Sequence, residues 1–218
     1  VFSLGAIRKS LNDNLSGELQ NNLLFCNAAA SLITEGLKGN PRQVKRFLNA
    51  FILRKKLAQV AQLSHVKDPV LVKLMILEYA EEDSFNELYK WQAAENGFPS
   101  KLKQLEEAIR SPSASTEDVI KSVGSKWGSP FHKKWIAMEP GLSEVDLRDY
   151  FWIARDRLQS TLSDVSLVTP HVRHIFDGLL SSNQALQIPA ANAARELQSD
   201  EVEMLFRLLS QHINRQPT

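Results

Sequence analysis

Glycine and proline are placed in this sequence so that they favour helices and disfavour a sheet. Most of them fall between stretches in which apolar residues recur every three or four positions, the spacing of one helical face. No run alternates apolar and polar residues for long enough to predict a β-strand. The sequence therefore predicts an all-α fold, an irregular multi-helix bundle that can divide into two helical sub-bundles near residues 95–116.

Recognisable caps mark the start of several expected helices. Asn40 with Pro41, and Asp68 with Pro69, combine an N-cap residue with proline at the first helical position. Ser143 begins a similar signal, a capping box with Asp in place of Glu. The expected helices cover residues 4–15, 17–37, 41–62, 69–94, 100–110, 144–159, 170–180, 189–197 and 200–213, with a flexible linker at 111–116 and an irregular packed connection at 124–142.

The overall charge shows that any electrostatic function must be local. The 218 residues include 26 Lys and Arg against 25 Asp and Glu, a formal net charge of +1. The single cysteine, Cys26, lies in an apolar run and is expected to be buried in a reducing compartment. No apolar run approaches the roughly 20 residues of a membrane helix, and no signal peptide is recognisable. We therefore expect a cytoplasmic protein with no membrane partner.

Residues 36–56 concentrate positive charge at the start of one expected helix. Seven basic residues and no acidic residue lie in this segment. On a helix of about 3.6 residues per turn, Arg42, Lys45 and Arg46 share one face, and Phe47 and Phe51 point to the opposite side. The pattern predicts a helix that is anchored in a core by its phenylalanines and presents a basic stripe.

A cluster of cations at a helix N-terminus indicates a bound anion. The helix dipole disfavours each exposed cation there by on the order of a few tenths of a kcal/mol. The free backbone N–H groups of the first turn bind anions, and arginine adds a fork that fits phosphate. Asn40, Arg42, Lys45 and Arg46 are therefore candidate anion-binding residues. A solvated basic face is the alternative.

The residues GLKGNPRQVKRFLNAFILRKKLA resemble the motif that follows the ATPase core in KAP-type P-loop NTPases. The stretches VLVKLMILEY and DLRDYFWIARD look similar to the C-terminal extension of bacterial KAP proteins, among them the ATPase component of the Qat anti-phage system. The resemblance implies that residues 1–94 are a helical lid and that residues 95–218 are an extension that docks partner subunits.

The resemblance also implies a role for one arginine. Arg42 matches the position from which a lid arginine reaches the γ-phosphate and senses the bound nucleotide, and Arg46 is the second choice. ATP and Mg²⁺ are the implied cofactors of the whole protein. Its implied partners are an upstream P-loop core of the same polypeptide and other defence proteins.

The chain departs from a complete ATPase in one respect. It has no G-x-x-x-x-G-K-[ST] phosphate loop and no parallel-sheet pattern. It begins at Val1, and the residues that follow look like the middle of a domain. We therefore expect a piece of a longer polypeptide that does not hydrolyse ATP alone.

Three further groups of residues are candidates with less support. His171 and His174 are three apart on an expected helix and could hold a metal, but only Asp177 lies near enough in sequence to complete the set. Lys133 and Lys134 are interleaved with aromatic residues, as on a nucleic-acid surface, although such aromatics also fill cores. The acidic residues of the fourth expected helix could face the basic stripe or be solvated; they are Glu78, Glu81, Glu82 and Asp83.

Two other functions fit the same residues. One is a nucleic-acid-binding helical module that uses Arg42, Lys45 and Arg46 with the Lys133–Lys134 pair. The other is a purely structural protein-interaction domain with no ligand. Binding that weakens steeply with salt would separate the first of these from the second.

Overall fold

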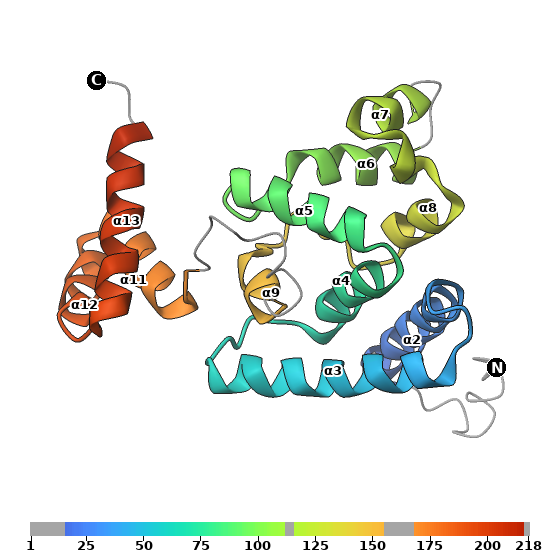
Figure 1. The fold of residues 1–218 in the computed structure, drawn as a ribbon, viewed down its shortest axis with the longest axis horizontal. Coiled ribbons are helices and arrows are strands. Elements are labelled where there is room, and N and C mark those ends of the chain that lie inside the picture. The colour runs from blue at the N-terminus through green and yellow to red at the C-terminus, as the bar shows by residue number, and fades with distance from the viewer. Residues whose placement is uncertain (1–15, 112–115, 155–167, 216–218) are drawn as a thin grey trace. The chain divides into compact units, whose positions relative to one another are not determined.

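The computed structural model describes residues 16–111, 116–154 and 168–215. Every element in these ranges is a helix, and none of these residues lies in a strand, so the all-α prediction is confirmed (Figure 1). The chain divides into two compact units, Val1–Phe151 and Trp152–Thr218. The first unit includes helices from both sides of residue 95. The division into a lid and an extension at residues 94 and 95 is a functional prediction and stays one.

Helix α4 (Asp68–Ala80) forms the centre of the first unit. It is apolar on all sides, and its residues from Val70 to Glu78 are all buried, as expected for a helix enclosed by other helices. Helices α2 (Gly17–Gly36) and α3 (Pro41–Val60) pack against it. A Cβ atom on Gly36 would lie 2.5 Å from the Cβ of Ala80, so glycine permits the close approach of α2 to α4.

The expected helix at residues 69–94 is two helices. Helix α4 ends at Ala80, and α5 (Glu82–Ala94) begins after Glu81, whose backbone leaves the helical region at φ −143° and ψ 71°. Glu82 and Asp83 lie in the first turn of α5, where the helix dipole favours negative charge. The acidic residues thus stabilise a second helix start.

Residues 124–142, expected to be irregular, hold two helical segments. After α6 (Ser100–Arg110) and α7 (Thr116–Val123) come the 3₁₀ helix η1 (Ser125–Gly128) and helix α8 (Pro130–Ala137). Ser129 caps α8 by accepting a hydrogen bond from the backbone N–H of His132 at 3.2 Å, with proline at the first position. Helix α3 begins in the same way, with Asn40 as its N-cap and Pro41 at its first position.

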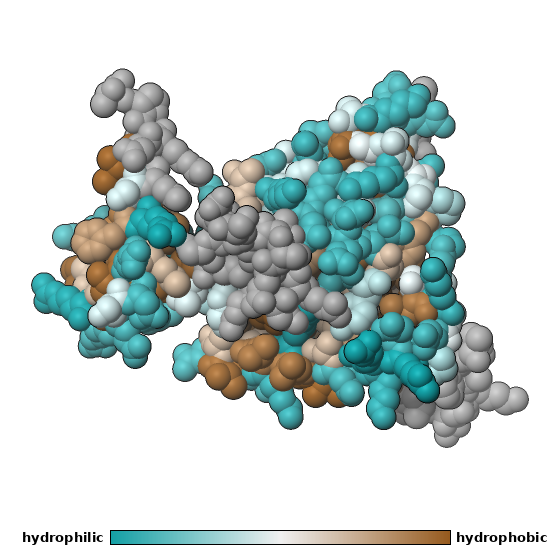
Figure 2. Space-filling model, in the orientation of Figure 1, coloured by the Kyte–Doolittle hydropathy of each residue, from teal (hydrophilic) through white to brown (hydrophobic). Residues whose placement is uncertain are grey.

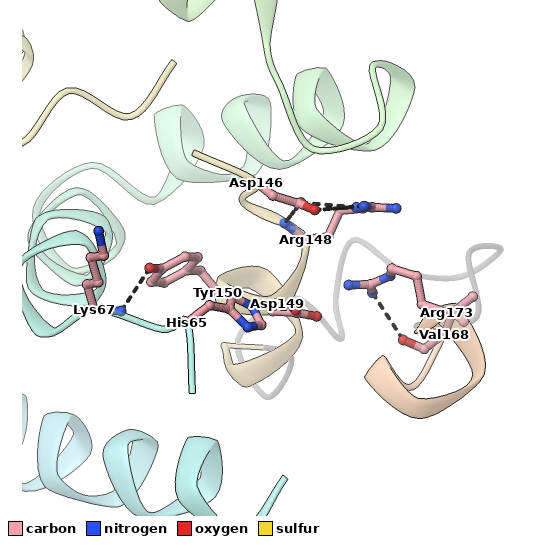
Figure 3. A network of polar contacts seen from close by, with 8 residues as sticks. All are labelled: His65, Lys67, Asp146, Arg148, Asp149, Tyr150, Val168 and Arg173. Carbon is pink, nitrogen blue, oxygen red and sulfur yellow. Dashed lines mark hydrogen bonds and ion pairs between the residues drawn. The ribbon is translucent and has the colours of Figure 1, made fainter. Parts of the chain in front are cut away.

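Helix α9 (Arg148–Ile153) begins later than the expected helix at 144–159. Asp146, not Ser143, accepts the backbone N–H of Arg148, and its carboxylate also binds the guanidinium (Figure 3). The backbone N–H of Leu147 donates to the carbonyl oxygen of Gly97 at 3.0 Å. Gly97 has φ +96°, and a Cβ atom there would lie 2.2 Å from Asp146, so the contact requires glycine.

The α3–α4 loop is held to α9 by side chains. The Tyr150 hydroxyl accepts a hydrogen bond from the backbone N–H of Lys67 at 2.9 Å (Figure 3). The His65 Nε2 lies 2.8 Å from the Asp149 carboxylate. Burial raises the pKa of the Tyr150 hydroxyl above its usual value. These contacts fix the loop that follows α3.

The second unit contains helices α11 (Pro170–Leu180), α12 (Gln184–Ala194) and α13 (Ser199–Arg215). Val172, Ile175 and Leu205 are the buried centre of its core. The helix expected at residues 170–180 is confirmed, because α11 has the same bounds. Helix α12 begins at Gln184, five residues before the expected start, and includes Pro189 in its interior. The guanidinium of Arg173 donates to the carbonyl oxygen of Val168 at 3.2 Å (Figure 3).

Three remaining expectations have separate outcomes. The expected helix at 4–15 and most of the linker at 111–116 lie outside the described residues. The expectation that Cys26 is buried is wrong, because this stretch of α2 turns its thiol outward and buries Ala29 and Leu32 instead. Among the helices that the structure describes, none is long and apolar enough to cross a membrane.

Candidate functional site

A short turn, closed by backbone hydrogen bonds, places the start of α3. After α2, Lys38 and Gly39 adopt left-handed backbone conformations, with φ values of 52° and 63°. The backbone N–H of Gly39 donates to the carbonyl oxygen of Thr34 at 2.9 Å, which closes the end of α2. Leu37, just before this turn, is buried. The turn therefore anchors α3 at its first residue.

Asn40 is the N-cap of α3, as the sequence predicts. Its Oδ1 accepts a hydrogen bond from the backbone N–H of Arg42 at 3.0 Å, and Pro41 occupies the first helical position. The cap occupies the amide oxygen, so the side-chain NH₂ group of Asn40 is the part left to donate to an anion. The cap fixes the direction in which the first turn of α3 begins.

The cationic side chains of this first part of α3 are exposed. Arg42, Lys45 and Arg46 all lie on the surface, whereas Phe47 is 2% exposed and packs edge-on against the ring of Tyr79 at 5.4 Å. Within the described residues, none of the three cationic side chains forms a hydrogen bond or an ion pair. No acidic residue lies in the first turn of α3. The expected stripe is therefore present, with its charges uncompensated by described neighbours.

Two other cations of the basic segment are compensated. Arg54 is 4% exposed and makes a two-pronged ion pair with the buried carboxylate of Glu78, with Nη2 and Oε1 at 3.0 Å. The amine of Lys55 pairs with the carboxylate of Asp68. The acidic residues of α4 and α5 therefore do not face the basic stripe. Glu78 binds Arg54, and the acidic residues that follow α4 are exposed.

The exposed arginines have the chemistry of a phosphate site. Arg42 and Arg46 are one helical turn apart, about 6 Å along the helix axis. Each guanidinium offers a planar fork that matches two phosphate oxygens, whereas the backbone N–H groups of Arg42 and Val44 are already bonded to Asn40. The geometry fits a phosphate-bearing ligand better than a neutral one. Glu35, the nearest acidic residue in sequence, pairs with Lys134 at 2.8 Å.

The aromatic residues near Lys133 and Lys134 lie in the core and do not form a nucleic-acid surface with the two lysines. Trp127 and Trp135 are fully buried and Phe131 is nearly so, so none of these rings can stack on a base. The two lysines are exposed, and Lys134 pairs with Glu35. The aromatic residues fill the space between α8 and its neighbours.

A buried histidine network was not foreseen from the sequence. His132 is 2% exposed, and its two ring nitrogens lie 2.7 Å from the Ser129 hydroxyl and 2.8 Å from the Ser84 hydroxyl. Burial, aided by the charge of Lys126, lowers the pKa of the imidazole. Ser84 is itself 1% exposed. The network joins α5 to α8 and cannot meet a substrate, so it is structural.

Lys73 is the second buried polar group that sequence reasoning missed. Its amine donates to the backbone carbonyl oxygens of Met138 at 2.5 Å and Pro140 at 2.9 Å, and it lies 4.0 Å from Glu106. Burial lowers its pKa to about 8. Glu106 in turn accepts the backbone N–H of Leu142 at 2.7 Å. The pair holds the segment after α8 against α4 and α6, which is a structural role.

No group of three metal-ligating side chains exists among the described residues. His171 and His174 are both exposed on α11. No family model, no curated protein and no solved structure matches this chain. Its function must therefore be argued from the residues that the structure places.

Proposed function

We propose that this chain is the helical C-terminal region of a KAP-type P-loop ATPase, with a lid and an extension that docks partners. In this proposal Arg42 is the nucleotide sensor, Arg46 supports it, and Asn40 and Lys45 complete the anion site. The parent protein would use ATP and Mg²⁺, and this chain would be inactive alone. It would act in the bacterial cytoplasm, in anti-phage defence, together with an upstream P-loop core and other defence proteins.

One observation carries the proposal. Arg42 and Arg46 project from a capped helix start, and their charges have no partner among the described residues. Other cations of the same basic segment, such as Arg54, are neutralised within the fold. Charge that the fold does not neutralise is available to a ligand that does. The resemblance to the KAP motif points to the phosphates of ATP as that ligand.

The proposed role follows from electrostatics. ATP, when bound, supplies the phosphoryl group whose transfer releases energy. Arg42 would bind oxygen atoms of the terminal phosphate and stabilise the charge that grows there during transfer. Arg46, one turn later, would hold the same ligand with a second fork, and Lys45 would add a point charge. The anchored turn before Asn40 keeps these groups in place.

The nucleic-acid alternative has weaker support. A surface that binds single strands combines cations with exposed aromatic rings. Here Phe47 and Trp135 are buried, and the arginines of α3 stand without a stacking platform. In a purely structural domain the exposed cations at the start of α3 are a solvated face. The ATPase proposal gives them a ligand.

ATP turnover by the polypeptide that joins this chain to its P-loop core tests the proposal. Arg42→Ala should lower kcat at least ten-fold, which corresponds to about 1.4 kcal/mol of transition-state stabilisation. Arg46→Ala should lower it less. Arg195→Ala is the matched control, because Arg195 is also exposed and lies in the second unit. Equal turnover by Arg42→Ala and Arg195→Ala would overturn the sensor role.

A salt series on the isolated chain tests the alternative. Nucleic-acid binding that neutralises several phosphates weakens steeply as salt rises. We expect only weak binding of a single-stranded oligonucleotide at low salt. Tight, strongly salt-dependent binding that Arg42→Ala and Lys45→Ala both weaken would favour the nucleic-acid module.

A further inference from the structure

The C-terminal half of α3, together with Leu48 just before it, exposes large aliphatic side chains. Leu48, Ile52 and Leu53 are each about half exposed, at 50%, 52% and 59%, and Val60 is 83% exposed. Figure 2 shows brown, hydrophobic surface over this half of α3 and teal, hydrophilic surface over its N-terminal half. Single exposed apolar residues need no explanation, but these four lie within about 140° of one another around the helix and form a patch. We call these four residues the aliphatic row.

Most of the aliphatic row lies away from the arginine site. Arg42 and Val60 lie at opposite ends of α3, about 27 Å apart along the axis by helical geometry. A ligand that occupies the arginines would therefore leave most of the row uncovered. The row needs an explanation of its own.

A cavity lies at the same end of α3. Its volume is about 540 Å³, it is open to solvent, and it is lined by the last turns of α3 and the loop that leads to α4. Ala58, Leu63 and Val66 line its apolar part, and Lys55, Gln59 and Asp68 are among the polar side chains that line it. Such a volume accepts a large apolar side chain from a partner, and the polar rim orients what enters.

The charge around the row favours an acidic partner. No Asp or Glu occurs between Glu35 and Asp68. Lys56 is exposed beside the row and forms no ion pair within the described residues. A partner that covers the row must offer apolar side chains and should carry negative charge beside them.

The nature of the row favours a protein over a nucleic acid. Bases bind proteins by stacking on exposed aromatic rings, and the exposed side chains of the row are all aliphatic. The aromatic side chains of α3 are not available: Phe47 is buried, and Phe51 is half-buried with the amine of Lys55 over its ring. Aliphatic rows on helices are typical of helix-to-helix recognition.

We propose that the aliphatic row and the cavity form a docking face for an acidic amphipathic helix of a partner protein. One apolar side chain of that helix enters the cavity, and others pack on Leu48 and Ile52, which lie on the side of α3 that faces the cavity. Its acidic residues lie near Lys56. This docking face extends the partner-binding role of the proposed function, but it does not depend on Arg42 or on nucleotide.

A synthetic peptide serves as the probe. The labelled helical peptide carries leucine on one face and glutamate on the other, and its binding to the full chain is followed by fluorescence anisotropy. A second peptide has lysine in place of every glutamate. We expect the acidic peptide to bind in the micromolar range and at least ten-fold tighter than the lysine peptide, with the difference lessened by salt.

Variants locate the binding. Ile52→Ser with Val60→Ser should weaken the acidic peptide at least ten-fold, and Lys56→Glu should weaken it less. Phe206→Ser with Ile213→Ser is the matched control, because these α13 residues are exposed to a similar degree, at 66% and 68%. The control should bind the peptide as the wild type does. A thermal melt of each variant establishes that it is folded.

Several results would overturn the proposal. They are equal binding of the two peptides, equal loss in the row and control variants, and displacement of the peptide by an oligonucleotide. Concentration-dependent self-association that Ile52→Ser with Val60→Ser abolishes would show that a second copy of the chain is the occupant instead. ATP turnover separates this proposal from the previous one. The row variant should leave turnover unchanged, and Arg42→Ala should leave peptide binding unchanged.

Discussion

Helices α3 and α4 are adjacent in sequence and packed together, yet they treat charged side chains in opposite ways. In α4 the charged residues Lys73 and Glu78 are buried, and each has partners within the fold. In α3 the cations of the first turns are exposed and have no described partner. The buried charges of α4 are neutralised within the fold, whereas the exposed charges in the first half of α3 are available to a ligand.

The difference has a physical basis. A buried charge that lacks a partner costs several kcal/mol, so a fold that keeps one must also supply the partner. An exposed charge costs almost nothing, so the fold does not have to compensate it. Removing a partner of Lys73 or Glu78 should therefore lower stability, whereas changing Arg42, which has no described partner, should affect binding and not stability. Variants of the two helices should differ accordingly.

The largest effect is expected at the ion pair that joins the two helices. Arg54→Met removes the cation that pairs with the buried carboxylate of Glu78, and should lower the free energy of unfolding by about 3–5 kcal/mol. Urea denaturation measures the change. Arg54→Met with Glu78→Leu should recover part of the loss, because both charges are then removed. Failure of the double variant to recover any stability would mean that packing, not charge, dominates at this site.

Lys73 should come next. Lys73→Met removes the donor to three backbone carbonyl oxygens and leaves Glu106 without its cation, so we expect a loss of about 2 kcal/mol. The matched control is Lys45→Met in α3, which should change stability by less than about 0.5 kcal/mol. Similar losses in both variants would remove the contrast between the two helices.

The pH dependence of stability should show the burial of Lys73. Its pKa is about 8 in the folded protein and near 10.5 in the unfolded chain. Between these values the unfolded chain binds the proton and the folded protein does not, so the contribution of Lys73 to stability rises with pH by about 1.4 kcal/mol per pH unit. Unfolding free energies measured from pH 8 upward should show this contribution as a difference from Lys73→Met. Parallel profiles of the two proteins would contradict it.

The smallest effect is expected at the anion site. Arg42→Ala should change the free energy of unfolding by less than about 0.5 kcal/mol, because the side chain is exposed and makes no described contact. Inorganic phosphate or ATP at millimolar concentration should shift the melting temperature of the isolated chain little, if the ligand also needs the P-loop core. A large loss of stability in Arg42→Ala would give this arginine a structural role.

Much of α3 was predictable from its sequence. The cap at Asn40, the burial of Phe47 and the exposure of Arg42 follow from local signals and from the helical period. The burial of Arg54 was also within reach, because Arg54 is seven residues after Phe47 and so shares its face. Its burial was not predicted because Arg54 stands in a run of basic residues, a residue type that is mostly exposed. A helical wheel read position by position would have separated Arg54 from the exposed cations.

The buried polar contacts were beyond the sequence for a different reason. Lys73 stands alone in an apolar run, which indicates a buried cation, but its acceptors at Met138 and Pro140 lie more than 60 residues away. His132 likewise meets Ser84 across two helices. Such contacts depend on tertiary packing, which no local pattern encodes. The same holds for the cavity beside Leu63, whose walls come together only after the loop has folded.

The turn between α2 and α3 has a mechanical consequence. Leu37 is buried, the backbone N–H of Gly39 donates to α2, and Asn40 caps α3. The connection between the two helices is therefore short and held by hydrogen bonds at both ends. Phe47 then fastens α3 to Tyr79 of α4. We therefore expect a displacement of Arg42 to move α3 together with α2 and to reach α4 through the contact between Phe47 and Tyr79.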